Sequence, residues 1–340
     1  MNQTRARSRK PAPGATLELS HIGLLVRVPE SPSGGSRVEG SLRMWEHPAV
    51  SGSLEPALPT AAVCPFVVER TGSGPPALLL HGGPGLSDYL DDLADLLGDR
   101  LECVRYTQRG VSPAPVEGPY TVAQHLADAT RVLDETGVAN AIVIGHSWGG
   151  YLAAELVAAH PHRIVALVSI DGLGLAGDGG WPAFDRHFED ALPASAAARV
   201  AEIDRRLVAA ETTGAEADAM LGEIMQVSWP YYFAQPSSAP PPPPFRLCGA
   251  AYGDTAADAK AALKAGTLAA ALRDCDVPAL FLRGSHSGFP RAAVEASAAL
   301  FTDGRYAEIA DAGHFLWVEQ PAATRTAILE FLTDVGALRD

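Results

Sequence analysis

Residues 141–150 read Ala-Ile-Val-Ile-Gly-His-Ser-Trp-Gly-Gly, and this stretch decides how the rest of the chain is interpreted. The four apolar residues predict a buried strand, and the Ala- and Leu-rich run 151–159 predicts a helix. Between them lies a Gly-x-Ser-x-Gly pattern, which is typical of a nucleophile elbow when it joins a strand to a helix. We expect glycine at 145 and 149 because side chains there would clash with the tightly turned backbone around Ser147.

The expected helix adds an electrostatic contribution at Ser147. A helix N-terminus carries partial positive charge and favours negative charge that develops beside it. The alternative is an ordinary glycine-rich turn with an incidental serine, because a short motif alone is only a hypothesis. The rest of the chain must therefore supply the other groups that an active serine needs.

The composition limits the classes of function. The chain has 340 residues, is 47% hydrophobic and carries a formal net charge of -14. A surface of this sign repels phosphates, so nucleic acid and anionic membranes are not expected as partners. No apolar run is long enough to span a membrane, and no apolar segment follows the basic residues 1–10 as in a secretory signal. We expect a cytoplasmic protein whose partner is a small-molecule ester or amide substrate.

The cysteines agree with this interpretation. They are scattered, with neither Cys-x-x-Cys nor the spacing of a zinc site; they are Cys64, Cys103, Cys248 and Cys275. We expect reduced thiols, as in a cytoplasmic protein. No metal or organic cofactor is expected.

Strands and helices alternate along most of the chain. Strands are expected at 66–70, 77–80, 101–106, 141–144, 164–170, 279–282 and 305–309, and helices at 87–97, 121–135, 151–159, 290–300 and 321–332. This alternation predicts an α/β fold, with a mostly parallel sheet and helices on both faces. Ser87 is the expected N-cap of the first helix.

The chain is expected to divide into three parts. Residues 1–62 form an N-terminal extension, partly disordered, with strand-like alternation at 17–28. Residues 63–171 and 272–340 form the α/β core. Residues 172–271 interrupt the alternation and form an inserted cap.

The inserted segment differs from the core in composition. It is rich in Gly, Ala and aromatic residues and contains a run of five prolines at 240–244. We expect a mostly helical cap that covers the site, excludes water and sets specificity. Trp181, Trp229 and Tyr232 are the expected substrate-binding residues.

A reactive serine needs a base, and the base needs an acid. The base takes the hydroxyl proton, and a carboxylate holds the base in one tautomer. In sheets of this kind the order along the chain is serine, acid, histidine. His314 follows the last expected strand, where that order requires the base; the alternative is a loop histidine bonded to the backbone. His81 and His146 lie inside motifs and are expected to form structural hydrogen bonds beside the site.

The position of the acid is less usual. The loop 283–290, after the penultimate strand, is one usual position, and it contains no carboxylate. The other is the end of the strand after the nucleophile helix, where Asp171 stands. Because the carboxyl ends of parallel strands open on one crevice, Asp171 can reach His314. Asp311, or no acid at all, are the alternatives.

An oxyanion hole needs backbone N–H groups aimed at the developing negative charge. Trp148, directly after the serine, is expected to supply one. Gly82 or Gly83, in the turn after strand 77–80, is expected to supply the other, since small residues let the backbone approach the substrate. The alternative is a glycine turn without this role.

With these motifs the sequence resembles the α/β-hydrolase superfamily, and within it the proline-iminopeptidase-like group. The resemblance covers about residues 63–332. Four motifs carry it: His81-Gly-Gly-Pro-Gly85, Gln108-Arg-Gly110, Gly145-His-Ser-Trp-Gly-Gly150 and Ala312-Gly-His314. The resemblance implies that Ser147 is the nucleophile and His314 the base. It also implies that the Gly83 and Trp148 amides are the oxyanion donors.

Three features depart from that group. Thr107 stands where its motif has aspartate, and Ser287 stands where the late-loop acid is expected, which moves the acid to Asp171. Those peptidases also hold a substrate ammonium with cap carboxylates. The candidates in this cap are Glu189, Asp190, Glu202, Asp204 and Glu223. A charged side chain on a solvated helix face is the alternative explanation for each.

We therefore expect a serine hydrolase that cleaves a small ester or amide through an acyl-enzyme intermediate. Ser147, His314 and Asp171 form the expected triad. One alternative is an esterase, lactonase or C–C hydrolase with the same triad and no ammonium pocket. Another is a non-catalytic ligand-binding protein of the same fold.

Overall fold

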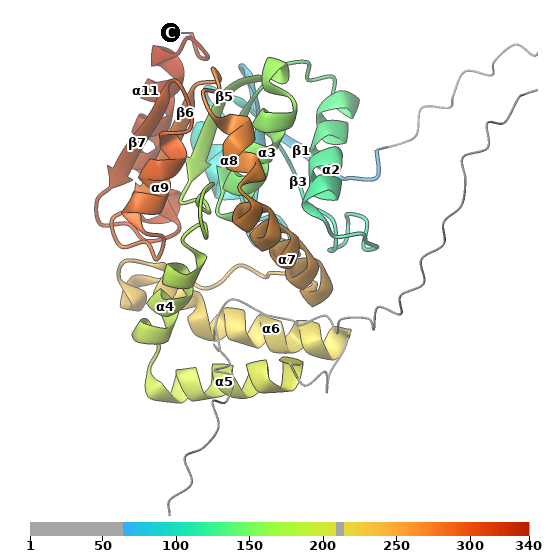
Figure 1. Ribbon diagram of the computed structural model, residues 1–340, viewed down its shortest axis with the longest axis vertical. Coiled ribbons are helices and arrows are strands. Elements are labelled where there is room, and N and C mark those ends of the chain that lie inside the picture. The colour runs from blue at the N-terminus through green and yellow to red at the C-terminus, as the bar shows by residue number, and fades with distance from the viewer. Residues whose placement is uncertain (1–63, 209–213, 340) are drawn as a thin grey trace, which may run out of the picture.

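The computed structural model describes residues 64–208 and 214–339, and Figure 1 shows how they are arranged. In this part of the chain the strands form one sheet in the order β1-β3-β2-β4-β5-β6-β7. β1 runs antiparallel to β3, and the other neighbours are parallel. The strands are β1 (Val68–Gly72), β2 (Pro76–Leu80), β3 (Glu102–Tyr106), β4 (Ala141–His146), β5 (Ile164–Ile170), β6 (Ala279–Gly284) and β7 (Gly304–Ile309). The predicted α/β fold with a mostly parallel sheet is confirmed.

Helices cover both faces of the sheet (Figure 1). They are α1 (Asp91–Leu97), α2 (Val122–Glu135), α3 (Trp148–Ala159), α4 (Trp181–Ala191), α5 (Ala194–Val208), α6 (Ala215–Ser228), α7 (Gly249–Ala265), α8 (Thr267–Leu272), α9 (Arg291–Ala298), α10 (Leu316–Glu319) and α11 (Pro321–Asp334). Successive strand side chains point to opposite faces. Leu78 thus packs in a cluster with residues of α2, α3, α8 and α9, and Leu79 in a cluster with residues of α1, α10 and α11.

Most predicted elements lie within a few residues of their expected bounds, but the start of the first helix was predicted wrongly. α1 begins at Asp91, and Ser87 is not its N-cap. The Ser87 hydroxyl instead accepts a hydrogen bond from the backbone N–H of Arg246 at 3.1 Å. Ser87 is thus used in a contact with a distant segment, which local sequence does not reveal.

The range 172–271, which the sequence predicts to be an inserted cap, contains two kinds of helix. Figure 1 shows α4, α5 and α6 below the sheet, with α7 and α8 closer to α3. α5 and α6 pack around a separate apolar cluster, made of Leu192, Val200, Ile203, Met220, Leu221 and Ile224. Trp181 and Phe184 of α4 pack against the core cluster instead. Leu263 of α7 and Leu268 of α8 belong instead to the cluster that includes α3. Within this range, α5 and α6 therefore form the part with a separate apolar cluster.

Some predictions concern residues that are not described. The expected N-terminal extension 1–62, including the strand-like run 17–28, lies outside the described residues. Within the described ranges, no helix has the length and apolar character needed to cross a membrane.

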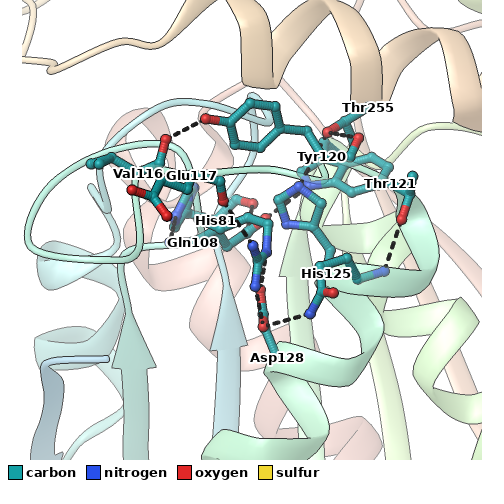
Figure 2. A network of polar contacts seen from close by, with 12 residues as sticks. His81, Gln108, Val116, Glu117, Tyr120, Thr121, His125, Asp128 and Thr255 are labelled. Carbon is teal, nitrogen blue, oxygen red and sulfur yellow. Dashed lines mark hydrogen bonds and ion pairs between the residues drawn. The ribbon is translucent and has the colours of Figure 1, made fainter. Parts of the chain in front are cut away.

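A buried ion pair holds the loop that follows β3. The Arg109 guanidinium donates to both carboxylate oxygens of Asp128, with Nη2 at 2.7 Å from Oδ1, and both side chains are buried. Nη1 of Arg109 donates to the Glu117 carbonyl at 3.0 Å. Figure 2 shows Asp128 pointing from α2 toward the loop that carries Gln108 and Glu117. The pair therefore ties this loop to the helix layer.

Replacing Arg109 with methionine is predicted to destabilise the fold strongly. The change leaves the buried Asp128 charge without its cation, with only the Gln124 amide donating to it at 3.2 Å, which costs about 3–5 kcal/mol of unfolding free energy. Urea unfolding measures the loss. The double variant Arg109→Met with Asp128→Leu removes both charges and is predicted to recover most of it. Equal stabilities of the single and double variants would contradict this account.

Candidate active site

Ser147 lies at the sharp turn between β4 and α3. Its backbone has φ +56° and ψ -122°, a strained combination for a residue with a side chain. A Cβ on Gly145 would come within 2.1 Å of the Gly149 carbonyl oxygen, and one on Gly149 within 1.9 Å of the Leu80 oxygen. The predicted need for glycine at both positions is confirmed. The elbow geometry raises the serine side chain above the end of the central strand.

The structure brings His314 and Asp171 together. Nδ1 of His314 lies 2.6 Å from Oδ2 of Asp171, and both side chains are buried. Asp171 directly follows β5, and His314 lies between β7 and α10. The other carboxylate considered from the sequence, Asp311, is exposed. Since Nδ1 is engaged with the acid, Nε2 is the ring nitrogen that remains for the serine and the substrate.

Ser287 supports the buried carboxylate. Its hydroxyl donates to Oδ2 of Asp171 at 2.8 Å, and the backbone N–H of Gly284 approaches Oδ1 at 3.2 Å. A buried carboxylate needs such donors to stay ionised. The loop that lacks an acid therefore donates hydrogen bonds to the acid on the neighbouring strand. From the sequence, Ser287 marked only the place where a carboxylate was expected. Its role could not be predicted, because its partner Asp171 is distant in the chain.

A single cavity contains the serine and the histidine. Ser147, Trp148, His314 and Gly83 are among the residues that line it. The walls are mostly apolar and include many aromatic rings. All three predicted cap residues belong to them: Trp181, Trp229 and Tyr232, with Phe184, Phe289 and Phe315. The Phe184 and Tyr232 rings each have their centroid 5.4 Å from that of His314. Apolar rings thus surround the candidate base.

The two glycines of the β2 turn have different roles. The backbone N–H of Gly82 donates to the Tyr89 hydroxyl at 2.8 Å, so it is already engaged. Among the described residues, no acceptor engages the N–H of Gly83 or of Trp148. Both of these residues line the cavity beside Ser147. Gly83 and Trp148 are therefore the candidate oxyanion donors. Gly82 is not a candidate, because its N–H already donates to the Tyr89 hydroxyl.

The cap is fastened to the histidine loop. The backbone N–H of His314 donates to the Tyr232 carbonyl at 2.7 Å. The Glu319 carboxylate accepts from the backbone N–H of Gly313 at 2.6 Å and of Ala234 at 2.8 Å. Burial raises the pKa of Glu319 above its usual value. These bonds connect the base to the cap segment that carries Tyr232, and no local sequence signal marks Glu319.

One buried carboxylate of the cap faces the cavity, and the sequence did not single it out. Asp185, on α4, lines the cavity, is 4% exposed and has no hydrogen-bond partner among the described residues. Burial raises its pKa to about 6. None of the five predicted cap carboxylates lines the cavity: Glu189, Asp190, Glu202, Asp204 and Glu223. Glu223, for example, forms an ion pair with Arg199.

Comparison with known proteins places this chain in a family. The family defined by the alpha/beta hydrolase fold matches residues 75–321, so the chain belongs to it. The predicted α/β-hydrolase enzyme is confirmed at this level.

Three relatives illustrate the similarity. A 2-hydroxymuconate semialdehyde hydrolase of Pseudomonas putida is 32% identical over 109 residues, which cover 31% of this chain and 39% of that protein. The enol-lactonase from Burkholderia xenovorans has a TM-score of 0.53 at 20% identity over 79% of this chain and 96% of that one. A thermophilic esterase from Thermogutta terrifontis gives 0.54 at 22% identity over 79% and 93%.

These comparisons support the coarser part of the resemblance noted from the motifs. The matches to curated relatives cover 31% to 40% of the length of those proteins. The names of the three relatives belong to semialdehyde, lactone and ester hydrolases rather than to proline iminopeptidases. The resemblance therefore holds for the α/β-hydrolase superfamily and not specifically for the peptidase group.

Asp171→Asn is predicted to lower turnover by about ten-thousandfold without unfolding the protein, because an amide cannot hold His314 in the right tautomer. Steady-state hydrolysis of an aryl ester and a thermal unfolding scan measure the two effects. Asp311→Asn is the matched control, since that carboxylate is exposed. Near-normal turnover in Asp171→Asn would rule out this residue as the acid.

Proposed function

We propose that the protein is a serine hydrolase that cleaves small esters or lactones through an acyl-enzyme intermediate. The observation that carries the proposal is the 2.6 Å contact between His314 and the buried Asp171, at the cavity that Ser147 also lines. A histidine held in this way accepts a proton on Nε2. Together these groups supply a nucleophile, a base and an acid.

The expected reaction follows from their positions. His314 takes the Ser147 proton as the hydroxyl attacks the substrate carbonyl, and the Asp171 carboxylate stabilises the imidazolium that forms. The Gly83 and Trp148 N–H groups stabilise the negative oxygen of the tetrahedral intermediate. His314 then protonates the leaving alcohol. Water, activated by the same histidine, releases the acyl group.

The character of the cavity favours a neutral acyl group. Its walls are mostly apolar, and the Phe184 and Tyr232 rings lie beside the base. Apolar walls bind the hydrocarbon part of a substrate, and few polar groups remain to orient it. The named lactonase and esterase relatives agree with this substrate class. The groups needed for chemistry are all present, which weighs against a decayed, purely ligand-binding site.

Hydrolysis of a simple aryl ester tests this proposal. The wild type is predicted to release the aryl alcohol and to be labelled by a fluorophosphonate probe at Ser147, and Ser147→Ala is predicted to lose both. Absorbance at the aryl alcohol band and peptide mass spectrometry give the readouts. Failure of the folded wild type to label would contradict the proposed function.

A second candidate is an amine-bearing acyl group, and Asp185 is the observation that favours it. This carboxylate is buried, lines the cavity and has no hydrogen-bond partner among the described residues. The Lys260 ammonium lies 4.2 Å from the centroid of the Trp181 ring. Its charge acts to lower the pKa of Asp185, but burial outweighs it. A substrate ammonium would compensate the Asp185 charge, as in the proline-iminopeptidase-like group.

A matched substrate pair tests this second candidate. An L-prolyl arylamide and the cyclopentanecarbonyl arylamide share a five-membered ring and differ in the amine. If Asp185 binds the amine, kcat/KM favours the prolyl substrate, and the preference rises between about pH 5 and 7 as the carboxyl ionises around its pKa of about 6. Asp185→Asn is predicted to abolish the preference. No preference in the wild type at pH 8 would exclude this candidate and leave the neutral ester.

A further inference from the structure

The side chain of His81 has a defined tautomer. The backbone N–H of Gln108 donates to Nε2 of His81 at 3.0 Å, so this nitrogen carries no proton. Nδ1 must then carry the ring proton, and it lies 2.9 Å from the carbonyl oxygen of Gly82, which can only accept. The ring is fully buried, and burial lowers the pKa of His81, which keeps it neutral. His81 therefore donates to Gly82 from a fixed position.

The Gly82 carbonyl belongs to the peptide group that also contains the N–H of Gly83. A trans peptide is planar, and its C=O and N–H point in opposite directions. Holding the carbonyl with His81 therefore sets the direction of the Gly83 N–H, and Gly83 lines the cavity. The other end of Gly82 is also held, because its N–H donates to the Tyr89 hydroxyl. The two peptide groups on either side of the Gly82 Cα are thus each held by a hydrogen bond.

Tyr89 extends this restraint to the catalytic loops. Nε2 of His146 lies 3.0 Å from the His314 carbonyl, so Nε2 carries the proton and Nδ1 accepts. The Tyr89 hydroxyl, 2.7 Å from that Nδ1, donates to it. The chain Gly82–Tyr89–His146–His314 therefore connects the oxyanion loop to the backbone of the candidate base. The expectation that His81 and His146 form hydrogen bonds beside the site is confirmed.

Gln108 connects the two candidate oxyanion donors. Its Nε2 donates to the His81 carbonyl at 2.8 Å, and its Oε1 accepts from the indole N–H of Trp148 at 2.9 Å. Trp148 supplies the second oxyanion N–H from its backbone. Figure 2 shows His81 and Gln108 side by side, above the part of the sheet where β2 and β3 end. One side chain thus sets the spacing between the two loops that would hold the oxyanion.

We propose that His81 is a positioning residue of the oxyanion hole, which aims the Gly83 N–H by holding the Gly82 carbonyl, and that Gln108 fixes both the His81 tautomer and the distance to Trp148. This inference rests on the proposed serine-hydrolase function. In this account the first residue of the His-Gly-Gly turn orients the peptide group that carries the Gly83 N–H. Neither residue touches the substrate, so both act only through the two backbone amides.

Two substitutions at one position separate the functions of the His81 ring. An asparagine amide reaches where Nδ1 lies and can still donate to Gly82, whereas a glutamine amide reaches where Nε2 lies and cannot. His81→Gln is predicted to lower kcat for the aryl ester by about tenfold to a hundredfold with KM unchanged, less than the loss of a whole oxyanion donor. His81→Asn is predicted to restore most of that kcat. His162→Gln, at an exposed histidine, is the control for the substitution itself.

Binding of an aryl boronic acid supplies a readout that a merely structural role would not change. The boronate forms a tetrahedral adduct with the serine and mimics the transition state. Its affinity, measured by tryptophan fluorescence, is predicted to fall in His81→Gln by the same factor as kcat, and to recover in His81→Asn. Should His81→Gln fail to fold in a thermal scan, Gln108→Met is predicted to show the same paired loss.

The outcomes separate this inference from the proposed function. A wild type that neither hydrolyses the ester nor binds the boronate overturns the serine-hydrolase proposal, and the oxyanion role with it. An active wild type with full kcat and boronate affinity in folded His81→Gln overturns the positioning role alone. Equal losses in His81→Gln and His81→Asn also overturn it, because the bond to the Gly82 carbonyl would then not be the cause. Retained kcat in folded Gln108→Met would remove Gln108 from the account.

Discussion

The positive φ of Ser147 is the constraint on which the rest of the site depends. A side chain at φ +56° is tolerated only where the surrounding backbone is tightly held. The neighbours are accordingly packed at close range: a Cβ on Gly82 would lie 2.7 Å from the Cβ of Ser147. The position of Ser147 therefore leaves no room for a side chain at Gly82 in the turn after β2, just as the elbow leaves none at Gly145 and Gly149. That turn also carries the Gly83 amide. The backbone that packs against the strained serine is therefore the same backbone that carries the candidate oxyanion donor.

Asp171, at the end of β5, serves as the candidate acid although the loop after β6 contains no carboxylate. Asp171 is fully buried, and its partners are His314, the Ser287 hydroxyl and the Gly284 amide rather than a lysine or an arginine. Because parallel strands end at the same edge of the sheet, β5 and β6 bring these groups together although they are far apart in sequence. The carboxylate stands at the end of β5, and the Ser287 hydroxyl in the loop after β6 donates to it.

Much of this arrangement was predictable from sequence, because it depends on local patterns and on strand order. Buried strands alternate with helices, the elbow has its glycines, and the base and acid stand at the ends of predicted strands. Ser287, Glu319 and Asp185 were not predictable. A serine in a loop and a lone aspartate on an amphipathic helix have ordinary solvated explanations. Their roles depend on contacts such as that of Glu319 with Ala234, which only the packing of the cap on the core creates.

The most direct test of the central claim is a crystal structure of the protein after reaction with an alkyl fluorophosphonate. The account predicts a phosphorus bonded to Oγ of Ser147. It also predicts that the phosphoryl oxygen accepts hydrogen bonds from the N–H groups of Gly83 and Trp148, while His81 keeps its bond to the Gly82 carbonyl. A phosphoryl oxygen turned toward solvent, or an adduct on another residue, would contradict the account.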